Sequence, residues 1–301
     1  MKLISFTHAG QIRSGLWLDK QVLDLGIAAR LAGQSIDLSS VLAIIGGQQS
    51  SLQAVRALEQ RAAELPEALL PSAGVRLLAP IAKLSRNAFC VGRNYLDHVK
   101  EGFDRSATPV KVPEVPQFFS KATHTLNSPD GDVRLDARVT SILDYEVELA
   151  VIIGTGGRDI PADRAMEHVF GYTVANDFTA RDLQRRHEQW FKGKSLDSLL
   201  PLGPWIIDKE TIGDPTTLEL SLTVNGQQRQ HARVAQMIFN IPTIIASLSA
   251  GLTLEAGDVI CTGTPAGVGY AMNPPQPLKV GDQVVSSIDR IGTLNNKIVA
   301  G

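Results

Sequence analysis

The chain has 301 residues, 44% hydrophobic and 20% charged, which is typical of a globular protein whose core needs no disulfide or structural metal. Its formal net charge of −2 argues against a general nucleic-acid-binding protein, which usually carries a basic excess. No apolar run approaches the ~20 residues of a membrane span, the N-terminus lacks a signal-peptide pattern, and the two cysteines fit no zinc or disulfide spacing, so we expect a cytoplasmic protein with no membrane partner.

The first 72 residues predict a small α+β domain. Short apolar runs at 2–6, 15–18 and 22–25 suggest a small sheet, and residues 51–64 suggest a helix capped by Ser50 or Ser51. Two prolines and a glycine within 65–74 favour a linker, so we place the domains at 1–72 and 73–301. The small domain holds no cluster of His, Cys, Asp or Glu, and we assign it no chemistry.

Short strands dominate the rest of the chain. They are expected at 88–91, 117–120, 133–135, 146–153, 172–176, 205–208, 218–224, 258–262 and 283–288. Asn225-Gly226 predicts a hairpin turn, and the clearest helices are 162–170 and 241–250, the latter ended by Gly251. This pattern predicts a mainly β domain, curled or barrel-like, with few helices.

Two glutamates at the start of a buried strand are the most informative feature. In a strand, residues i and i+2 point to the same face, so Glu146 and Glu148 lie about 7 Å apart along the backbone with both carboxylates on one side. Like charges this close repel unless a cation joins them. The alternative is the solvated face of an edge strand.

A third carboxylate would complete a site for a hard cation. Asp177 ends the strand 172–176, and three carboxylates with waters suit Mg²⁺ or Mn²⁺. Asp177 can equally cap a helix that begins there, with Arg181 and Gln184 on the same helical face. Arg181 can then bind a substrate carboxylate or form an ion pair with Asp177 or Asp182. Asp144 lies on the same strand face as the two glutamates, which leaves the choice of ligands open.

A histidine and a glutamate three residues apart follow the strand 88–91. If this segment is helical, His98 and Glu101 are neighbours and form a candidate general-base dyad, although a surface pair would have the same spacing. Lys121 and Lys194 are candidates for neutralising the negative charge of an enolate. The alternative is that both are ordinary surface lysines. The Gly-rich loop 262–269, which includes Thr264, allows close backbone approach to a ligand but is not a P-loop.

Together these segments resemble the fumarylacetoacetate hydrolase family, in particular its two-domain bacterial members of the 2-hydroxyhepta-2,4-diene-1,7-dioate isomerase and acylpyruvate hydrolase type. Six runs carry the resemblance in the family's order: Gly92-Arg93-Asn94-Tyr95 with His98 and Glu101, Phe118 to Lys121, Asp144 to Leu149, Gly171-Tyr172 with Asn176 to Gln184, Lys194 to Asp197 with Pro201 to Pro204, and Thr262 to Gly269. Any one run is a weak signal, and six in order are specific.

The resemblance implies a β-sandwich or barrel-like catalytic fold, a homodimer, and Mg²⁺ or Mn²⁺ on Glu146, Glu148 and Asp177, with Asp144 beside them. It also implies a dyad of His98 and Glu101 on a lid segment, to which 102–116 can contribute, and substrate-facing positions at the residues that match the family's remaining motifs: Lys121, Arg181, Gln184, Lys194 and Thr264.

Members of the family hydrolyse acylpyruvate-type C–C bonds, decarboxylate oxaloacetate, or isomerise hydroxymuconate-like diacids of aromatic catabolism. We expect a metal-dependent enzyme that acts on a small 2-oxo or 2,4-dioxo acid by C–C hydrolysis. The alternatives are an isomerase, tautomerase or decarboxylase of a 2-oxo diacid and, from another class, a catalytically idle metal-dependent ligand binder.

Overall fold

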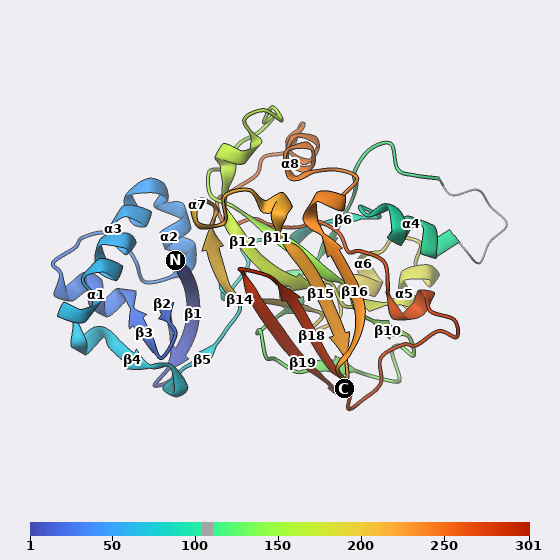
Figure 1. The fold of residues 1–301 in the computed structure, drawn as a ribbon, viewed down its shortest axis with the longest axis horizontal. Helices are drawn as coiled ribbons and strands as arrows, with labels where there is room; N and C mark the ends of the chain where they lie inside the picture. The colour runs from blue at the N-terminus through green and yellow to red at the C-terminus, as the bar shows by residue number, and fades with distance from the viewer. Residues whose placement is uncertain (104–110) are drawn as a thin grey trace.

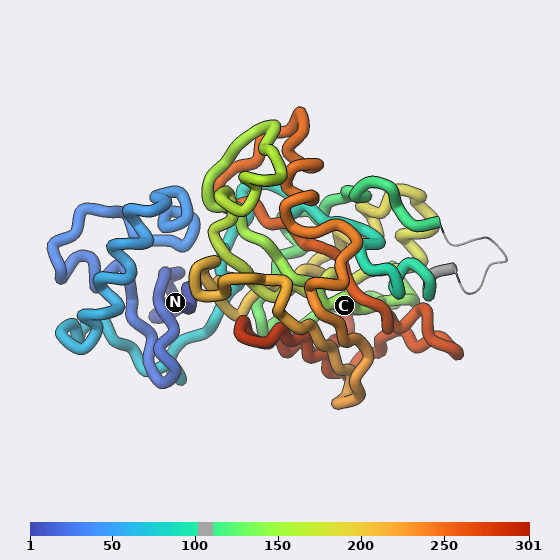
Figure 2. The backbone as a smooth tube through the Cα atoms, turned by 45° about the horizontal axis from the view of Figure 1, so that its top comes forward, coloured from blue at the N-terminus to red at the C-terminus, as the bar shows by residue number. Residues whose placement is uncertain are grey.

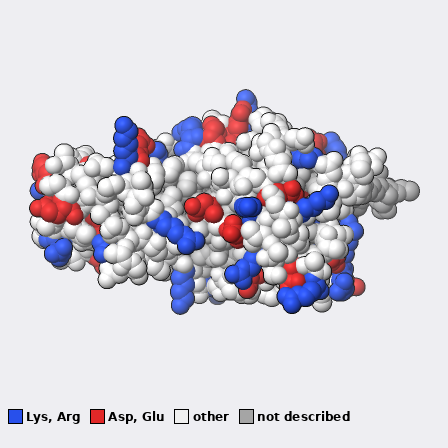
Figure 3. Space-filling view, turned by 90° about the horizontal axis from the view of Figure 1, so that it is seen from below, with Lys and Arg blue, Asp and Glu red and all other residues white. Residues whose placement is uncertain are grey.

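The computed structural model describes residues 1–103 and 111–301, and it is mainly β (Figure 1). The prediction of a lid at 102–116 therefore lies partly outside the described residues. None of the described helices is long and apolar enough to cross a membrane. On the face seen from below, acidic and basic side chains are interspersed rather than gathered by sign (Figure 3).

The N-terminal segment forms a small antiparallel sheet covered by helices, as the sequence predicts. Its elements are β1 (Lys2–His8), β2 (Gln11–Leu18), β3 (Gln21–Asp24), β4 (Leu69–Pro71), β5 (Arg76–Leu77), α1 (Leu25–Leu31), α2 (Val41–Gly46) and α3 (Gln48–Gln60). This unit lies at one end of the molecule in two views (Figures 1 and 2).

Two details of this unit differ from the predictions. Helix α3 begins at Gln48 after Gly47, without a side-chain cap from Ser50 or Ser51. The stretch 65–74 supplies β4, which pairs with β3, so it belongs to the small sheet instead of crossing between domains as a free linker. The small sheet is also continuous with the large one, because β1 pairs with β14.

The rest of the chain packs two sheets face to face. The large sheet continues from β14 (Leu200–Asp208) through β12 (Val169–Asn176), β11 (Val147–Ile153), β17 (Val259–Cys261) and β6 (Ala88–Gly92) to β7 (Gln117–Lys121). The second sheet has the order β16 (Gln227–Arg233), β15 (Glu219–Val224), β18 (Gln283–Ile288), β19 (Gly292–Ala300) and β9 (Val133–Leu135). Two short pairings add β8 (Leu126–Asn127), β10 (Leu143–Asp144) and β13 (Thr179–Ala180).

Five helices accompany these sheets: α4 (Leu96–Phe103), α5 (Arg181–Arg186), α6 (Phe191–Lys194), α7 (Lys209–Ile212) and α8 (Ile241–Ser249). The hairpin turn at Asn225-Gly226 is confirmed, with both residues at positive φ, and α8 matches its prediction. The predicted helix 162–170 is wrong. Only one 3-10 turn forms, at Ala165–His168, because the apolar residues from Val169 onward pair with β11 instead.

Strand β11 decides where the two glutamates point. Its odd-numbered residues from Val147 to Ile153 pack into the core between the two sheets, whereas Ala150 and Ile152 belong to the other core cluster. Glu146 and Glu148 share the parity of the second set, so both carboxylates point away from the inter-sheet core. Because β11 lies inside the sheet between β12 and β17, the alternative of a solvated edge strand is wrong.

Candidate active site

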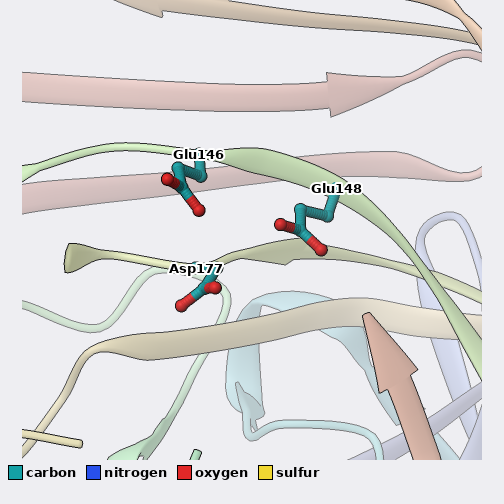
Figure 4. Close-up of side chains that lie close together, drawn as sticks. All are labelled: Glu146, Glu148 and Asp177. Carbon is teal, nitrogen blue, oxygen red and sulfur yellow. The ribbon is translucent and has the colours of Figure 1, made fainter. Parts of the chain in front are cut away.

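Three buried carboxylates meet where β11 begins and β12 ends. Glu146 immediately precedes β11, Glu148 lies within it, and Asp177 immediately follows β12 (Figure 4). Asp177 is held beside the glutamates because its N–H donates to the carbonyl of Glu146 at 2.8 Å. One carboxylate oxygen of each residue lies within 4.8 Å of the others. Oxygens that share one octahedral Mg²⁺ lie about 3–4 Å apart, so small side-chain adjustments would bring all three onto one ion.

The charges around this triad are unevenly matched. Lys194 donates to Glu146 at 2.6 Å and to Asp177 at 2.7 Å, and Lys121 pairs with the other oxygen of Asp177 at 2.6 Å. Glu148, only 1% exposed, accepts a hydrogen bond from the N–H of Gly263 and forms no ion pair with any described residue.

The pKa values of the two glutamates reflect this difference. Burial alone would raise the pKa of Glu146, but Lys194 and Arg181 lower it to about 2. Burial raises the pKa of Glu148 well above its usual value, and the neighbouring Asp177, Cys261 and Glu146 raise it further. A buried carboxylate with no cation beside two others is a poor structural element and a good ligand, so the residues present fit a divalent cation such as Mg²⁺ or Mn²⁺.

Arg181 lines the cavity and is also held by three protein side chains. Its Nε donates to Asp144 at 3.0 Å, its Nη2 pairs with Glu146 at 2.7 Å, and its Nη1 donates to Gln184 at 3.3 Å. The alternative pairing of Arg181 with Asp177 or Asp182 is wrong. So is the helix cap at Asp177, because α5 begins only at Arg181.

Asp144 is a saturated structural carboxylate. Besides Arg181, it accepts hydrogen bonds from the backbone N–H groups of Tyr145, Gly269 and Tyr270. It lies outside the triad whose oxygens converge. Its four donors explain why it neighbours the candidate metal centre without belonging to it.

The substitution Asp144→Asn should therefore destabilise the protein strongly. An amide cannot balance the buried guanidinium of Arg181, and breaking a buried ion pair costs about 3–5 kcal/mol. Urea unfolding followed by circular dichroism would measure the loss. Asp97→Asn is the matched control: Asp97 is exposed and, among the described residues, pairs only with Lys100, so the unfolding free energy of this variant should equal that of the wild type. Equal stability of the two variants would contradict this account of Asp144.

The predicted dyad forms on α4. His98 Nδ1 lies 2.7 Å from Glu101 Oε1, and the other oxygen of Glu101 accepts a hydrogen bond from the N–H of Gly267 at 2.8 Å. With Nδ1 engaged by an acceptor, Nε2 is the ring nitrogen available for proton transfer. Both side chains are largely buried, so the alternative of an incidental pair on the surface is wrong.

The Gly-rich loop after β17 holds three carboxylates from two other motifs, the 92–101 run and the 144–149 run. Its N–H groups donate to Glu148 from Gly263, to Glu101 from Gly267 and to Asp144 from Gly269. Gly267 has φ +108°, and a Cβ there would lie 1.9 Å from the carbonyl oxygen of Arg229. At this position the loop needs glycine because its backbone packs tightly against that of Arg229, a constraint that the sequence did not indicate.

A cavity of about 350 Å³ opens onto the site. Its lining includes most of the predicted residues: His98, Glu146, Glu148, Arg181, Gln184, Lys194 and Thr264. Asp177, Glu101 and Lys121 are not among the lining residues. Lys121 is fully buried, where it donates to the carbonyl of Phe178 and pairs with Asp177. Thr264 donates to the carbonyl of Val147 and accepts from Gln230, which ties the loop to β11.

Sequence reasoning missed several residues of the site. Arg185, Trp190 and Tyr270 also line the cavity. A Cβ on Gly92 would lie 2.2 Å from the ring of Trp190. The Gly92-Arg93-Asn94-Tyr95 run therefore needs glycine at its first position to leave room for this ring. Asn94 is fully buried and bonds both the strand end at Thr262 and the backbone of Phe239. The sequence singled out this run as a motif, but the roles of its glycine and asparagine depend on tertiary contacts.

Known proteins share this architecture. The family described as fumarylacetoacetate (FAA) hydrolase, C-terminal, matches residues 87–299. The chain is 49% identical to the oxaloacetate tautomerase YisK of Bacillus subtilis over 224 residues, which are 74% of this chain and 73% of YisK.

Two solved structures extend the likeness to the whole chain. The fumarylacetoacetate hydrolase of Exiguobacterium antarcticum has a TM-score of 0.80 at 39% identity, covering 100% of both chains. The maleylpyruvate hydrolase of Sphingobium sp. SYK-6, solved with manganese(II) and pyruvate, has a TM-score of 0.77 at 29% identity, again covering 100% of both chains. From its motifs, its fold and these matches, the chain belongs to the fumarylacetoacetate hydrolase family.

Proposed function

We propose that the protein is a divalent-metal-dependent tautomerase that interconverts the enol and keto forms of a small 2-oxo dicarboxylic acid of the oxaloacetate kind. One observation carries the proposal: a base with a free ring nitrogen, His98, lines the same cavity as the candidate metal ligands Glu146 and Glu148. The similarity to YisK, an oxaloacetate tautomerase that is 49% identical to this chain, supports it.

Tautomerisation needs only proton transfers at two atoms of the substrate. A bound Mg²⁺ or Mn²⁺ would hold the carboxylate and 2-oxo oxygens and stabilise the negative charge of the enolate. His98 Nε2 takes the proton from the enol O–H, and the protonated imidazole delivers it to C3, so the ring returns to its starting state and water is neither consumed nor released. Glu101 holds the ring and stabilises its charged form through Nδ1.

The other residues keep the ligands and the charge in place. Lys194 bridges Glu146 and Asp177, and Lys121 fixes the second oxygen of Asp177, so we assign Lys121 a positioning role. Lys194 and Thr264 reach the cavity, where a cation and a hydroxyl can contact the substrate. The homodimer that the family implies stays a prediction, which light scattering on the purified protein would check.

Hydrolysis of a C–C bond in an acylpyruvate-type acid is the second candidate. The same dyad can activate a water toward a distal carbonyl, and a structural neighbour of the chain is a maleylpyruvate hydrolase. This reaction differs in its products, because water is consumed and two acids are released.

Product identification on a panel of substrates separates the candidates. The wild type with Mg²⁺ or Mn²⁺ should convert enol-oxaloacetate to the keto form, which a keto-specific dehydrogenase detects. No carbon dioxide and no hydrolysis product should form. A chelator should abolish the acceleration. Cleavage of an acylpyruvate into two acids, with enol-oxaloacetate unaffected, would replace the proposal by the hydrolase, and release of carbon dioxide would identify a decarboxylase. No turnover of any panel member would leave the idle ligand binder.

A further inference from the structure

Helix α5 presents two arginines to the cavity, one turn apart. Arg181 and Arg185 are at i and i+4, so they lie on the same face of the helix. Their guanidinium carbons lie 5.4 and 4.6 Å from the centre of the Tyr270 ring, and all three side chains line the cavity. The sequence singled out only Arg181 as a binder of a substrate carboxylate.

The two arginines differ in what they already bind. Arg181 is buried and uses its Nε and both terminal nitrogens on Asp144, Glu146 and Gln184. Arg185 is exposed at the cavity, and its guanidinium makes no ion pair or hydrogen bond with any described residue, although the Tyr270 ring stacks against it. The fork that can still accept a carboxylate in a bidentate manner is therefore that of Arg185.

The candidate metal ligands and Arg185 reach the cavity from different elements of the fold. Glu146 and Glu148 mark the end that would receive the metal and the 2-oxo acid group. Arg185 lies on α5, beyond Arg181, and Glu188 is the only other acidic side chain among the described lining residues, without an ion pair to Arg185. A substrate with a single carboxylate would leave Arg185 unused.

We infer that Arg185 binds the distal carboxylate of a 2-oxo dicarboxylic acid and thereby selects dicarboxylic over monocarboxylic substrates. The inference rests on the proposed function for the position of the 2-oxo acid end. Arg181 is then a positioning residue that fixes Glu146 and Asp144, and the Tyr270 ring aligns Arg185. A monocarboxylate of equal length should lose this contact and bind more weakly.

Calorimetric titration of the Mg²⁺-loaded protein tests the inference without relying on turnover. Oxaloacetate and 2-oxobutyrate are matched in chain length and differ in the distal carboxylate. The wild type should prefer oxaloacetate, and Arg185→Gln should weaken oxaloacetate binding by about 10- to 100-fold while leaving 2-oxobutyrate unchanged, as expected for loss of one charge-assisted contact.

Three comparison variants sharpen the result. Arg186→Gln removes the same charge from the next residue of α5, which does not line the cavity, and should bind both acids as the wild type does. Glu188→Gln should not weaken oxaloacetate binding. If it does so as strongly as Arg185→Gln, Arg185 acts by holding Glu188 and the inference fails. If Arg93→Gln, which removes another arginine that lines the cavity, abolishes the preference and Arg185→Gln does not, the assignment to Arg185 is wrong.

The binding experiment and the proposed function can fail separately. If Arg185-dependent binding of the diacid is measured but no tautomerisation occurs, the inference stands and the proposed reaction falls. If tautomerisation is rapid and Arg185→Gln binds both acids normally, the reaction stands and the inference falls.

Discussion

Replacing Glu148 with glutamine should abolish the stabilisation of the protein by Mg²⁺ or Mn²⁺ and reduce its activity by about 10³-fold or more. Glu148 is the carboxylate of the triad with no cation of its own among the described residues, so a bound ion is its natural partner. The neutral amide keeps the size and can still accept the hydrogen bond from Gly263, but it offers the ion no charge.

Thermal unfolding with and without metal measures this effect independently of catalysis. At an ion concentration about 100 times the Kd, the wild type should gain about 2.7 kcal/mol of unfolding free energy, seen as a higher Tm. Glu148→Gln should show almost no shift. Glu188→Gln is the matched control, because it removes a carboxylate that lines the same cavity outside the triad and should keep the full shift. A full metal-induced shift in Glu148→Gln would show that the ion binds elsewhere.

The pair of glutamates among the candidate metal ligands and the dyad on α4 could be predicted from the sequence because both depend on local geometry. Strand periodicity alone places Glu146 and Glu148 on one face, and helical spacing alone joins His98 to Glu101. Both arrangements occur in the structure. The family resemblance then selected Asp177 from the alternatives that spacing left open.

The other half of the site depends on contacts that no local pattern encodes. Arg181 pairs with Asp144 across 37 positions of the chain, so its commitment to protein groups could not be read from its spacing to Asp177. Tyr270, whose ring packs against Arg185, comes from a single 3-10 turn at Gly269–Ala271, which is too short to show a periodicity in the sequence. The failed helix at 162–170 has the same origin, because pairing of β12 with β11 outweighs a weak local helical tendency.

Replacing His98 with alanine should lower kcat by about 10²- to 10⁴-fold, the usual contribution of a general acid or base, while leaving the metal-induced rise in Tm intact. The imidazole lines the cavity but lies outside the converging carboxylate oxygens, so its removal should spare the ion. This split between chemistry and metal binding is what a merely structural histidine would not produce. Enol-oxaloacetate turnover and thermal unfolding, measured on the same preparations, provide both readouts.

Glu101→Gln should give a smaller loss than His98→Ala, and the double variant should be no worse than His98→Ala alone. The glutamate acts only through the ring, since its oxygens are used on His98 Nδ1 and on the N–H of Gly267, so removing the ring already removes its contribution. Asp97→Asn, a carboxylate with the same i,i+3 pairing on the exposed side of α4, should keep wild-type activity. Additive losses in the double variant would mean that Glu101 contributes to the reaction independently of His98, and full activity of His98→Ala would remove the dyad from the mechanism.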